Sequence, residues 1–261
     1  MRVVKYVPIL PALLLCACVD QRAPDRVASG ANFAEPRSLD AARGIDLPTD
    51  GSDFLNELKS SRLDFVARYY RDPASHWPTL SGREVQRLSS LGLNIVAVWE
   101  SHSHNPAHMS YADGYYDAVS AYGQAKAAGQ PAGSAIYFAI DFDARNEALA
   151  SVDQYFRGVG AGFAAASGGR PRYKVGVYGS GAVCAAVKQA GLARYAWLSN
   201  STAWSGSLAY EGWDIRQGGR LAELSFNHDA DEARKEYGSF RVTDVQVAAP
   251  YEALRQQSQR D

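Results

Sequence analysis

Short runs of apolar and β-branched residues alternate with longer amphipathic segments along the middle of the chain. Such runs are typical of buried strands, and amphipathic segments are typical of helices that cover a sheet. The predicted strands are 43–47, 64–70, 94–100, 134–141 and 173–179. The predicted helices are 81–92, 111–131 and 146–166, although glycines weaken the last of them. This alternation predicts an α/β fold with a parallel sheet and helices outside it.

The later apolar runs differ, because loops rather than long helices separate them. They are YAWLS (195–199), GWDIRQ (212–217) and LSFNHDA (224–230). A count near eight strands in one domain favours a closed barrel, since α/β barrels commonly exceed the usual domain length. The sequence therefore predicts a modified (β/α)8 TIM-like barrel over residues 43–245, with a reduced helical complement in its second half.

The first 17 residues look like a lipoprotein signal peptide. Arg2 and Lys5 precede a short apolar stretch that is too short to span a bilayer as a helix. Leu15-Cys16-Ala17-Cys18 resembles a bacterial lipobox, which implies that Cys18 is lipidated and becomes the new N-terminus. More than one acyl chain would then give a lasting membrane anchor. An ordinary secretory signal cleaved nearby is the alternative.

Polar, weakly patterned residues flank the predicted barrel. Residues 18–42 are expected to be a tether between membrane and domain, and 246–261 a C-terminal tail. The net charge of −1 over 261 residues gives no electrostatic argument for a nucleic-acid partner. Cys184 lies in an Ala-rich helical pattern, and we expect it to be a small buried side chain without a disulfide.

The predicted strand at 134–141 leads into two acids, Asp141 and Asp143. Side chains alternate along a strand. One face carries Ile136, Phe138, Ile140 and Phe142, and the other carries Ala135, Tyr137, Ala139, Asp141 and Asp143. The bulky set should face the helices, which places both acids inward at the C-terminal mouth of the barrel. Two nearby carboxylates resist ionising together, which yields a proton donor and a charged base. The alternative is that these acids cap a helix or pair with Arg68 or Arg145.

Acids also mark the ends of other predicted strands. Asp46 follows the outward Ile45, Glu100 closes its run, and Asp229 begins a second D-x-D pair with Asp231. Arg68 is a cation inside a β run and needs an anion nearby. The aromatic residues near these acids are Tyr69, Trp99, Tyr178, Trp197 and Trp213. Aromatic faces contact sugar rings and carboxylates accept hydrogen bonds from hydroxyls, so the pattern predicts a glycan-binding cleft.

Motifs in order along 43–235 resemble the bacterial glycoside-hydrolase-like family known as domain of unknown function 1906. They include RGIDLP, FVARYYR, GLNIVAVWE, GQPAGSAIYFAIDFDA, VGVYGSG and WDIRQ. That family is similar to the family 25 glycoside hydrolases, which are muramidases that cut peptidoglycan on a modified (β/α) barrel. By this resemblance Asp46, Asp141, Asp143 and Asp229 are the catalytic candidates. Arg68, Glu100, Tyr178, Trp197 and Trp213 are the substrate-binding candidates.

One position departs from the muramidase pattern, because Asp143 stands where those enzymes have the general acid Glu. Aspartate is one methylene shorter, and misplacement of a reacting group by about 1 Å can cost about a hundredfold in rate. Three alternatives follow. The acid is Asp143 with an adjusted backbone, the acid is Glu100, or the site binds glycan without cutting it. The resemblance thus implies a cell-envelope lipoprotein that acts on or binds peptidoglycan or a related glycan, with no cofactor.

Three histidines follow Glu100 in the segment ESHSHNPAH, namely His102, His104 and His108. H-x-H spacing can ligate zinc. Loop histidines without a strict motif more often line a cleft, so no metal is expected, and a metal-dependent hydrolase is a weaker alternative. This loop should overhang the same mouth.

Overall fold

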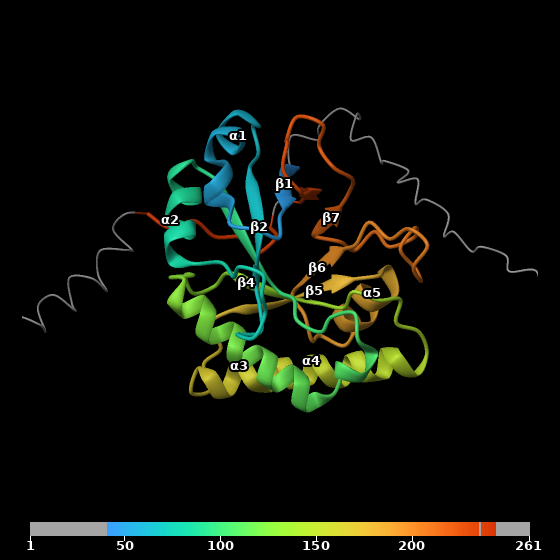
Figure 1. Ribbon diagram of the computed structural model, residues 1–261. Helices are drawn as coiled ribbons and strands as arrows, with labels where there is room; N and C mark the ends of the chain where they lie inside the picture. Colours follow the sequence, from blue (N-terminus) through green and yellow to red (C-terminus); the bar gives the residue numbers. More distant parts are fainter. Residues whose placement is uncertain (1–40, 235, 244–261) are drawn as a thin grey trace, which may run out of the picture.

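The computed structural model describes residues 41–234 and 236–243, which form a closed eight-stranded barrel with helices around it (Figure 1). The strands are β1 (Ala42–Asp46), β2 (Phe65–Tyr70), β3 (Asn94–Trp99), β4 (Ala135–Ala139), β5 (Lys174–Gly179), β6 (Tyr195–Leu198), β7 (Ile215–Gln217) and β8 (Asp229–Ala233). Neighbouring strands from β1 to β7 are parallel. The predicted α/β barrel is confirmed.

The modification of the barrel lies in β8, which runs antiparallel to both β7 and β1. No helix crosses over between β7 and β8, and antiparallel strands need only a loop to connect them. Because β8 is reversed, its first residue, Asp229, pairs with the last residue of β1, Asp46. The start of β8 therefore lies at the same end of the barrel as the C-terminal ends of the other strands.

The helices all precede β6 within the described residues, which confirms the reduced second half. They are η1 (Gly51–Phe54), α1 (Leu55–Ser60), α2 (Gly82–Ser90), η2 (Pro106–His108), α3 (Tyr111–Ala127), α4 (Glu147–Ala166) and α5 (Gly181–Gln189). Serines begin three of them: Ser81, Ser110 and Ser180 each accept a hydrogen bond from a first-turn backbone N–H. The long helices α3 and α4 pack side by side beneath the barrel (Figure 1).

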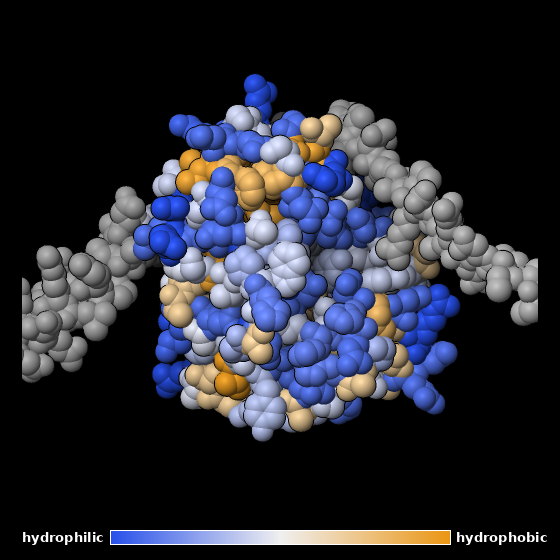
Figure 2. Space-filling view, in the orientation of Figure 1, coloured by the Kyte–Doolittle hydropathy of each residue, from blue (hydrophilic) through white to orange (hydrophobic). Residues whose placement is uncertain are grey.

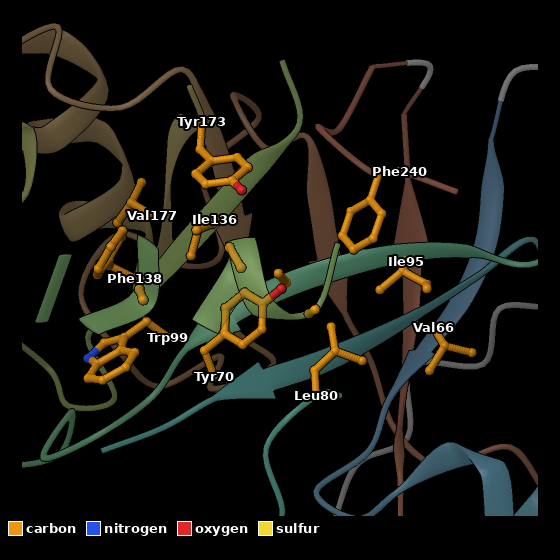
Figure 3. Close-up of a cluster of buried hydrophobic side chains, with 14 of the residues drawn as sticks. Val66, Tyr70, Leu80, Ile95, Trp99, Ile136, Phe138, Tyr173, Val177 and Phe240 are labelled. Atoms are coloured by element: carbon orange, nitrogen blue, oxygen red, sulfur yellow. The ribbon is translucent and has the colours of Figure 1, made fainter. Parts of the chain in front are cut away.

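The two faces of β4 are as the sequence predicts. Ile136 and Phe138 pack in the layer between barrel and helices, together with Trp99 and Tyr173 (Figure 3). Tyr137 points into the barrel, where a Cβ on Gly176 of the next strand would lie 2.5 Å from its ring. Small residues in the interior thus make room for large rings from neighbouring strands.

The surface in the view of Figure 2 is mostly hydrophilic, with apolar side chains gathered over α1 and beside the β7–β8 loop. Phe54, next to α1, stacks on Phe226 of that loop with ring centroids 4.2 Å apart. Ser225 also bonds Glu57 of α1 through its backbone N–H and its hydroxyl, both at 2.9 Å. These contacts hold the β7–β8 loop against α1 at one side of the barrel.

Cys184 is a fully buried free thiol on α5, as predicted, and burial raises its pKa to about 12. No helix in the described part of the chain is both long and apolar enough to cross a membrane. The predicted signal peptide, Cys18, nearly all of the tether, and the tail at 246–261 lie outside the described residues.

Candidate active site

A pocket of about 270 Å³ opens at the end of the barrel where the parallel strands finish. Asp46 and Trp197 come from strand residues, while Glu100 and Asp141 lie just beyond the ends of β3 and β4. Of the predicted site residues, Asp46, Glu100, Asp141, Tyr178, Trp197 and Asp229 line this pocket. The barrel brings together four acids that are up to 183 positions apart in the sequence, between Asp46 and Asp229.

Asp46 is held firmly at the wall of this pocket. Its Oδ1 accepts a hydrogen bond from the Tyr69 hydroxyl at 2.5 Å, and its Oδ2 accepts one from Nε2 of Gln217 at 2.8 Å. Burial raises the pKa of Asp46 to about 6, although the Tyr69 bond opposes that rise. The charge of Asp229 raises the pKa further. Asp46 is therefore mostly ionised only above about pH 6.

Asp231 lies two residues after Asp229 on β8, deeper in the barrel, and is buried. Its Oδ1 accepts a hydrogen bond from Nε1 of Trp197 at 3.0 Å, and no donor among the described residues reaches its Oδ2. Burial, followed by the charges of Asp46 and Asp229, raises the pKa of Asp231 well above its usual value. Asp231 is thus the acid that keeps its proton to higher pH than is usual for an aspartate.

Glu100 follows the last residue of β3 and faces the pocket opposite a cation. Burial raises its pKa to about 7, and the nearby Arg71 opposes this rise. The charges of Asp141 and Asp46 raise the pKa further. A carboxyl group with such a pKa is a substantial proton donor at neutral pH.

The remaining two acids complete the charged wall. Burial raises the pKa of Asp141, and the charge of His104 opposes it. Burial also raises the pKa of Asp229, against the charges of His228 and Arg220. Burial is thus the leading cause of the raised pKa at each of the four pocket acids.

Aromatic and amide side chains connect the acids. The Tyr178 hydroxyl donates to Oε1 of Gln217 at 3.1 Å, and the amide of Gln217 then donates to Asp46. Tyr178 also packs edge-on against Trp197, with centroids 5.3 Å apart. The pocket thus has a rigid aromatic floor and one ordered chain of hydrogen bonds that ends on Asp46.

The expectation that Asp143 faces this pocket is wrong. Strand β4 ends at Ala139, so strict alternation does not extend to residue 143. Phe142 packs outward as predicted and Asp141 lines the pocket, but Asp143 accepts bonds from Arg145 at 2.8 Å and from the Ser205 backbone at 2.8 Å. Slight burial raises the pKa of Asp143, but these bonds outweigh it and lower the pKa below its usual value.

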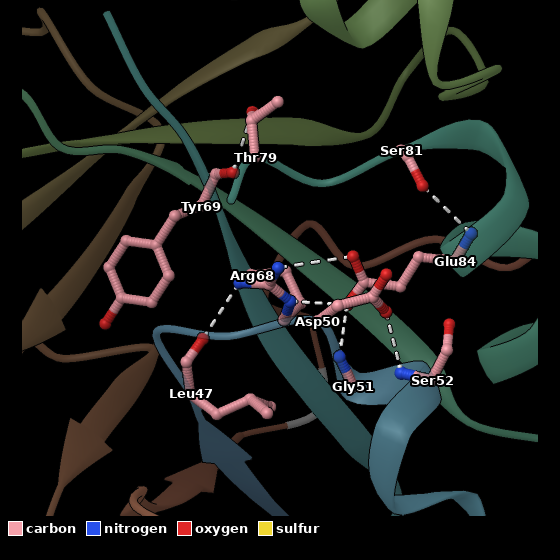
Figure 4. Close-up of polar contacts among 9 residues, drawn as sticks. All are labelled: Leu47, Asp50, Gly51, Ser52, Arg68, Tyr69, Thr79, Ser81 and Glu84. Carbon is pink, nitrogen blue, oxygen red and sulfur yellow. Dashed lines mark hydrogen bonds and ion pairs between the residues drawn. The ribbon is translucent and has the colours of Figure 1, made fainter. Parts of the chain in front are cut away.

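Arg68 also lies away from the pocket, contrary to the sequence expectation. Figure 4 shows its side chain on the face of β2 opposite to Tyr69. It bonds Oε1 of Glu84 at 2.5 Å and Oε2 at 3.2 Å, and it donates to the Leu47 carbonyl at 2.9 Å. The side chains of Arg68 and Glu84 are fully buried. The anion that Arg68 required is Glu84 of α2, so Arg68 attaches a helix to the barrel.

Trp213 also lies outside the pocket, contrary to the sequence expectation. It precedes β7, so it lies at the end of that strand opposite to Gln217 and the pocket. It is buried, and the guanidinium carbon of Arg234 lies 3.7 Å from its ring centroid, with that of Arg216 at 4.8 Å. Trp213 thus packs against two guanidinium groups outside the pocket.

The histidine loop borders the site without forming a metal centre in the described residues. The rings of His102 and His108 lie tilted against each other with centroids 4.6 Å apart, and His108 lies 3.5 Å from Asp113 and 3.7 Å from Asp117. No group of three or more His, Cys, Asp or Glu side chains within 41–234 and 236–243 is arranged to hold a metal ion. The loop does reach the acids, because the backbone N–H of Asp141 donates to the Ser103 carbonyl at 2.9 Å.

Three further residues shape the acids, namely Tyr69, Gln217 and Asp231. The sequence marks Tyr69 as a nearby aromatic and Asp231 as part of a D-x-D pair, but it did not predict their bonds. Tyr69 was detectable, since it alternates with Arg68 on one strand and one of the two had to point inward. Asp231 repeats the inward face of Asp229 two residues later. Gln217 carried no signal, because a single amide at a short strand is common in any protein.

A family model described as "Rv2525c-like, glycoside hydrolase-like domain" matches residues 56–248, which is more than half of the 261-residue chain. Two uncharacterized proteins of Bacillus subtilis (strain 168) are similar in sequence. YbfG is 32% identical over 131 residues, which are 49% of this chain and 18% of YbfG. FadG is 31% identical over 169 residues, which are 61% of this chain and 28% of FadG. The match thus spans less than a third of the length of either relative.

Solved structures share the fold. The Tat-secreted protein Rv2525c of Mycobacterium tuberculosis, in complex with HEPES, aligns with a TM-score of 0.63 at 20% identity, covering 77% of this chain and 99% of that one. The spore cortex lytic enzyme SleM of Clostridium perfringens aligns with a TM-score of 0.51 at 11% identity, covering 77% and 70%. The family match confirms the glycoside-hydrolase-like resemblance, and the chain belongs to the Rv2525c-like family of glycoside hydrolase-like domains.

Proposed function

We propose that this protein is a cell-envelope glycoside hydrolase that cleaves peptidoglycan or a related glycan in the acid-lined pocket. The observation that carries the proposal is the pair formed by Glu100 and Asp46, whose pKa values are about 7 and about 6 in one cavity. Glycoside hydrolysis needs one carboxyl group that gives a proton and another that is ionised. Near neutral pH these two residues supply both.

In the proposed reaction, Glu100 transfers its proton to the glycosidic oxygen as the bond from that oxygen to the anomeric carbon breaks. Ionised Asp46, fixed by Tyr69 and Gln217, stabilises the positive charge that develops on the sugar, or orients a substrate N-acetyl group as the nucleophile. Asp141 and Asp229 add negative charge to the same wall. Water then completes the hydrolysis at the anomeric carbon, and Glu100 is reprotonated.

Peptidoglycan is proposed on two grounds. The sequence resembles the muramidases in the order of its strand-end acids, and Asp46, Asp141 and Asp229 line one pocket. The similarly folded SleM is named as a spore cortex lytic enzyme. Glu100 takes the role of general acid in this proposal because Asp143 is engaged by Arg145 and Ser205 outside the pocket.

The test is digestion of purified peptidoglycan by the full-length protein, with new reducing ends and released muropeptides measured. Wild type is expected to release both, and Glu100→Gln to lose the activity by about a hundredfold or more. Asp143→Asn is the matched control, because its side chain lies outside the pocket, and it should retain activity. Loss in Asp143→Asn with retention in Glu100→Gln would restore Asp143 as the acid.

A binding protein without turnover is the second candidate, favoured by the substitution of Asp for the muramidase Glu at position 143. Under this hypothesis the protein sediments with insoluble peptidoglycan but releases no reducing ends. Asp46→Ala and Trp197→Ala would then weaken sedimentation. Binding that is unchanged in both variants would place any glycan contact outside the pocket.

The envelope location is also a proposal. It rests on the lipobox-like Leu15-Cys16-Ala17-Cys18 and on the Tat-secreted character of the similarly folded Rv2525c. Wild type expressed in a bacterial host is expected to partition into detergent, and Cys18→Ser to move to the aqueous phase. Cys16→Ser is the control and should remain in detergent. Equal partition of all three would show that Cys18 carries no anchor.

A further inference from the structure

The acid pocket continues into a second hollow of about 360 Å³ along the barrel mouth. Both share Asp46, Tyr69, Glu100 and Asp229, so the two form one groove. The second hollow differs in chemistry, because its walls add the cation Arg71 and the indole of Trp77. A groove of this kind has room for a sugar next to the one held at the acids.

Arg71 lines this groove together with Glu100, and the charge of Glu100 acts on its guanidinium. Its guanidinium carbon lies 4.4 Å from the ring centroid of Tyr69, and its Nε is buried without a hydrogen-bond partner. Burial lowers the pKa of Arg71, while the charge of Glu100 opposes that effect. A guanidinium at the wall of a groove can hold an anionic ligand through charge-assisted hydrogen bonds.

The position of Arg71 is fixed by its backbone rather than by its charge. Its N–H donates to Oε1 of Gln124 at 3.2 Å, and its carbonyl accepts from Nε2 of Gln124 at 2.6 Å. Together with the stacking on Tyr69, these bonds hold the guanidinium at the groove before any ligand arrives. Such preorganisation lowers the entropy lost on binding.

Trp77 supplies the apolar surface of the same hollow. It is 56% exposed, which is unusual for a tryptophan, and it lies on the loop between β2 and α2. An exposed indole face at a polar groove is suited to pack against the apolar face of a sugar ring. Arg71 and Trp77 thus offer a cation and a flat surface within one hollow.

We propose that this hollow is a subsite for a sugar that carries a carboxylate, with the ring on Trp77 and the carboxylate on Arg71. The proposal rests on the proposed function and deepens it, because it gives the substrate class as an acidic glycan. It also gives a role to the guanidinium that lines this hollow beside Asp46, Glu100 and Asp229. A neutral glycan would offer that guanidinium no carboxylate.

The experiment compares two glycans that differ only in charge. One is peptidoglycan strands freed of peptides, whose lactyl groups carry free carboxylates, and the other is the same strands with those carboxylates reduced to alcohols. Affinity of the full-length protein for each is measured by calorimetry, and reducing-end release is measured separately. Wild type should bind the carboxylated strands about tenfold to about a hundredfold more tightly, as expected for hydrogen bonds to a charged group.

Arg71→Gln should lose this preference and bind both strands alike. Trp77→Ala should weaken both equally, whereas Tyr116→Ala, an exposed aromatic on α3, should change neither. If Arg71 served only to tune Glu100, Arg71→Gln would shift the pH profile of cleavage while keeping the preference between strands. That result, or equal binding of the two strands by wild type, overturns the subsite.

The outcomes also separate this subsite from the proposed enzyme. Preference for carboxylated strands without reducing-end release keeps the subsite and rejects hydrolysis. Release from both strands at equal rates and affinities keeps hydrolysis and rejects the subsite. Failure to bind either strand rejects both.

Discussion

The hydroxyl of Tyr69 donates to Oδ1 of Asp46 over 2.5 Å, across the parallel pair β1 and β2. Burial keeps the pKa of Tyr69 well above its usual value, and the charge of Asp46 adds to that, so the phenol remains a donor at every physiological pH. This bond opposes the burial that raises the pKa of Asp46. One residue that carries no charge therefore lowers the pH at which Asp46 ionises.

Tyr69→Phe should raise the pKa of Asp46 above about 6, because the hydrogen bond to its ionised form is lost. The acidic limb of the pH profile of kcat/KM is expected to move to higher pH, by roughly one unit for a bond of about 1–2 kcal/mol. Tyr70→Phe is the matched control, since Tyr70 points to the other face of β2 and bonds Gln130. An unmoved limb in Tyr69→Phe would show that Asp46 does not set it.

The sequence predicted the inward acids correctly in the strands and just beyond their ends, and failed at Asp143, further from the end of its strand. Alternation from Ile45 correctly places Asp46 in the pocket. The same rule fails for Asp143, because β4 stops four residues earlier and a turn separates Asp143 from the inward face. Side-chain periodicity holds only while the ladder of hydrogen bonds persists.

Long-range pairing was the other limit. The sequence shows that Arg68 needs an anion, but nothing local identifies Glu84 as its partner. The direction of β8 was equally hidden, because apolar runs do not record whether a strand is parallel. The number of strands and the lack of helices after β6 among the described residues were predicted, since both follow from the spacing of apolar runs.

The raised acid pKa values predict that stability falls as the pH rises. Asp46 has a pKa of about 6 in the fold against 3.8 as a free group, and Glu100 about 7 against 4.5. Between about pH 4 and 7 the folded state therefore binds more protons than the unfolded state. The free energy of unfolding should decrease across that window, by about 3 kcal/mol per group at most. Urea unfolding at pH 5 and pH 8 measures it.

A variant isolates the contribution of Glu100 to this slope. Glu100→Gln removes the ionisation, so it should be more stable than wild type at pH 8 and show a smaller fall between pH 5 and pH 8. Glu211→Gln is the control, because Glu211 is 84% exposed, and its slope should equal that of wild type. A slope that is unchanged in Glu100→Gln would contradict the raised pKa.

The ion pair between Arg68 and Glu84 should govern stability and leave the chemistry intact. Arg68→Met leaves the buried carboxylate of Glu84 without its partner, which costs about 3–5 kcal/mol of unfolding free energy. Arg157→Met, in an exposed pair with Asp153 on α4, should cost less than about 1 kcal/mol. Below its melting range Arg68→Met should keep the KM and pH profile of wild type. A changed pH profile would show that Arg68 acts on the pocket acids.

Gly158 and Gly160 lie on roughly opposite sides of α4, and they should respond in opposite directions to the same substitution. A Cβ on Gly158 would lie 2.0 Å from the backbone oxygen of Tyr111, so Gly158→Ala must push α4 away from α3 and should cost about 1–3 kcal/mol or more. A Cβ on Gly160 meets nothing within 4 Å, so Gly160→Ala should stabilise the helix by up to about 1 kcal/mol. Thermal unfolding of both variants measures the contrast. The packing of α3 against α4 thus requires Gly158 but not Gly160, and equal effects at the two positions would refute the close approach of the two helices.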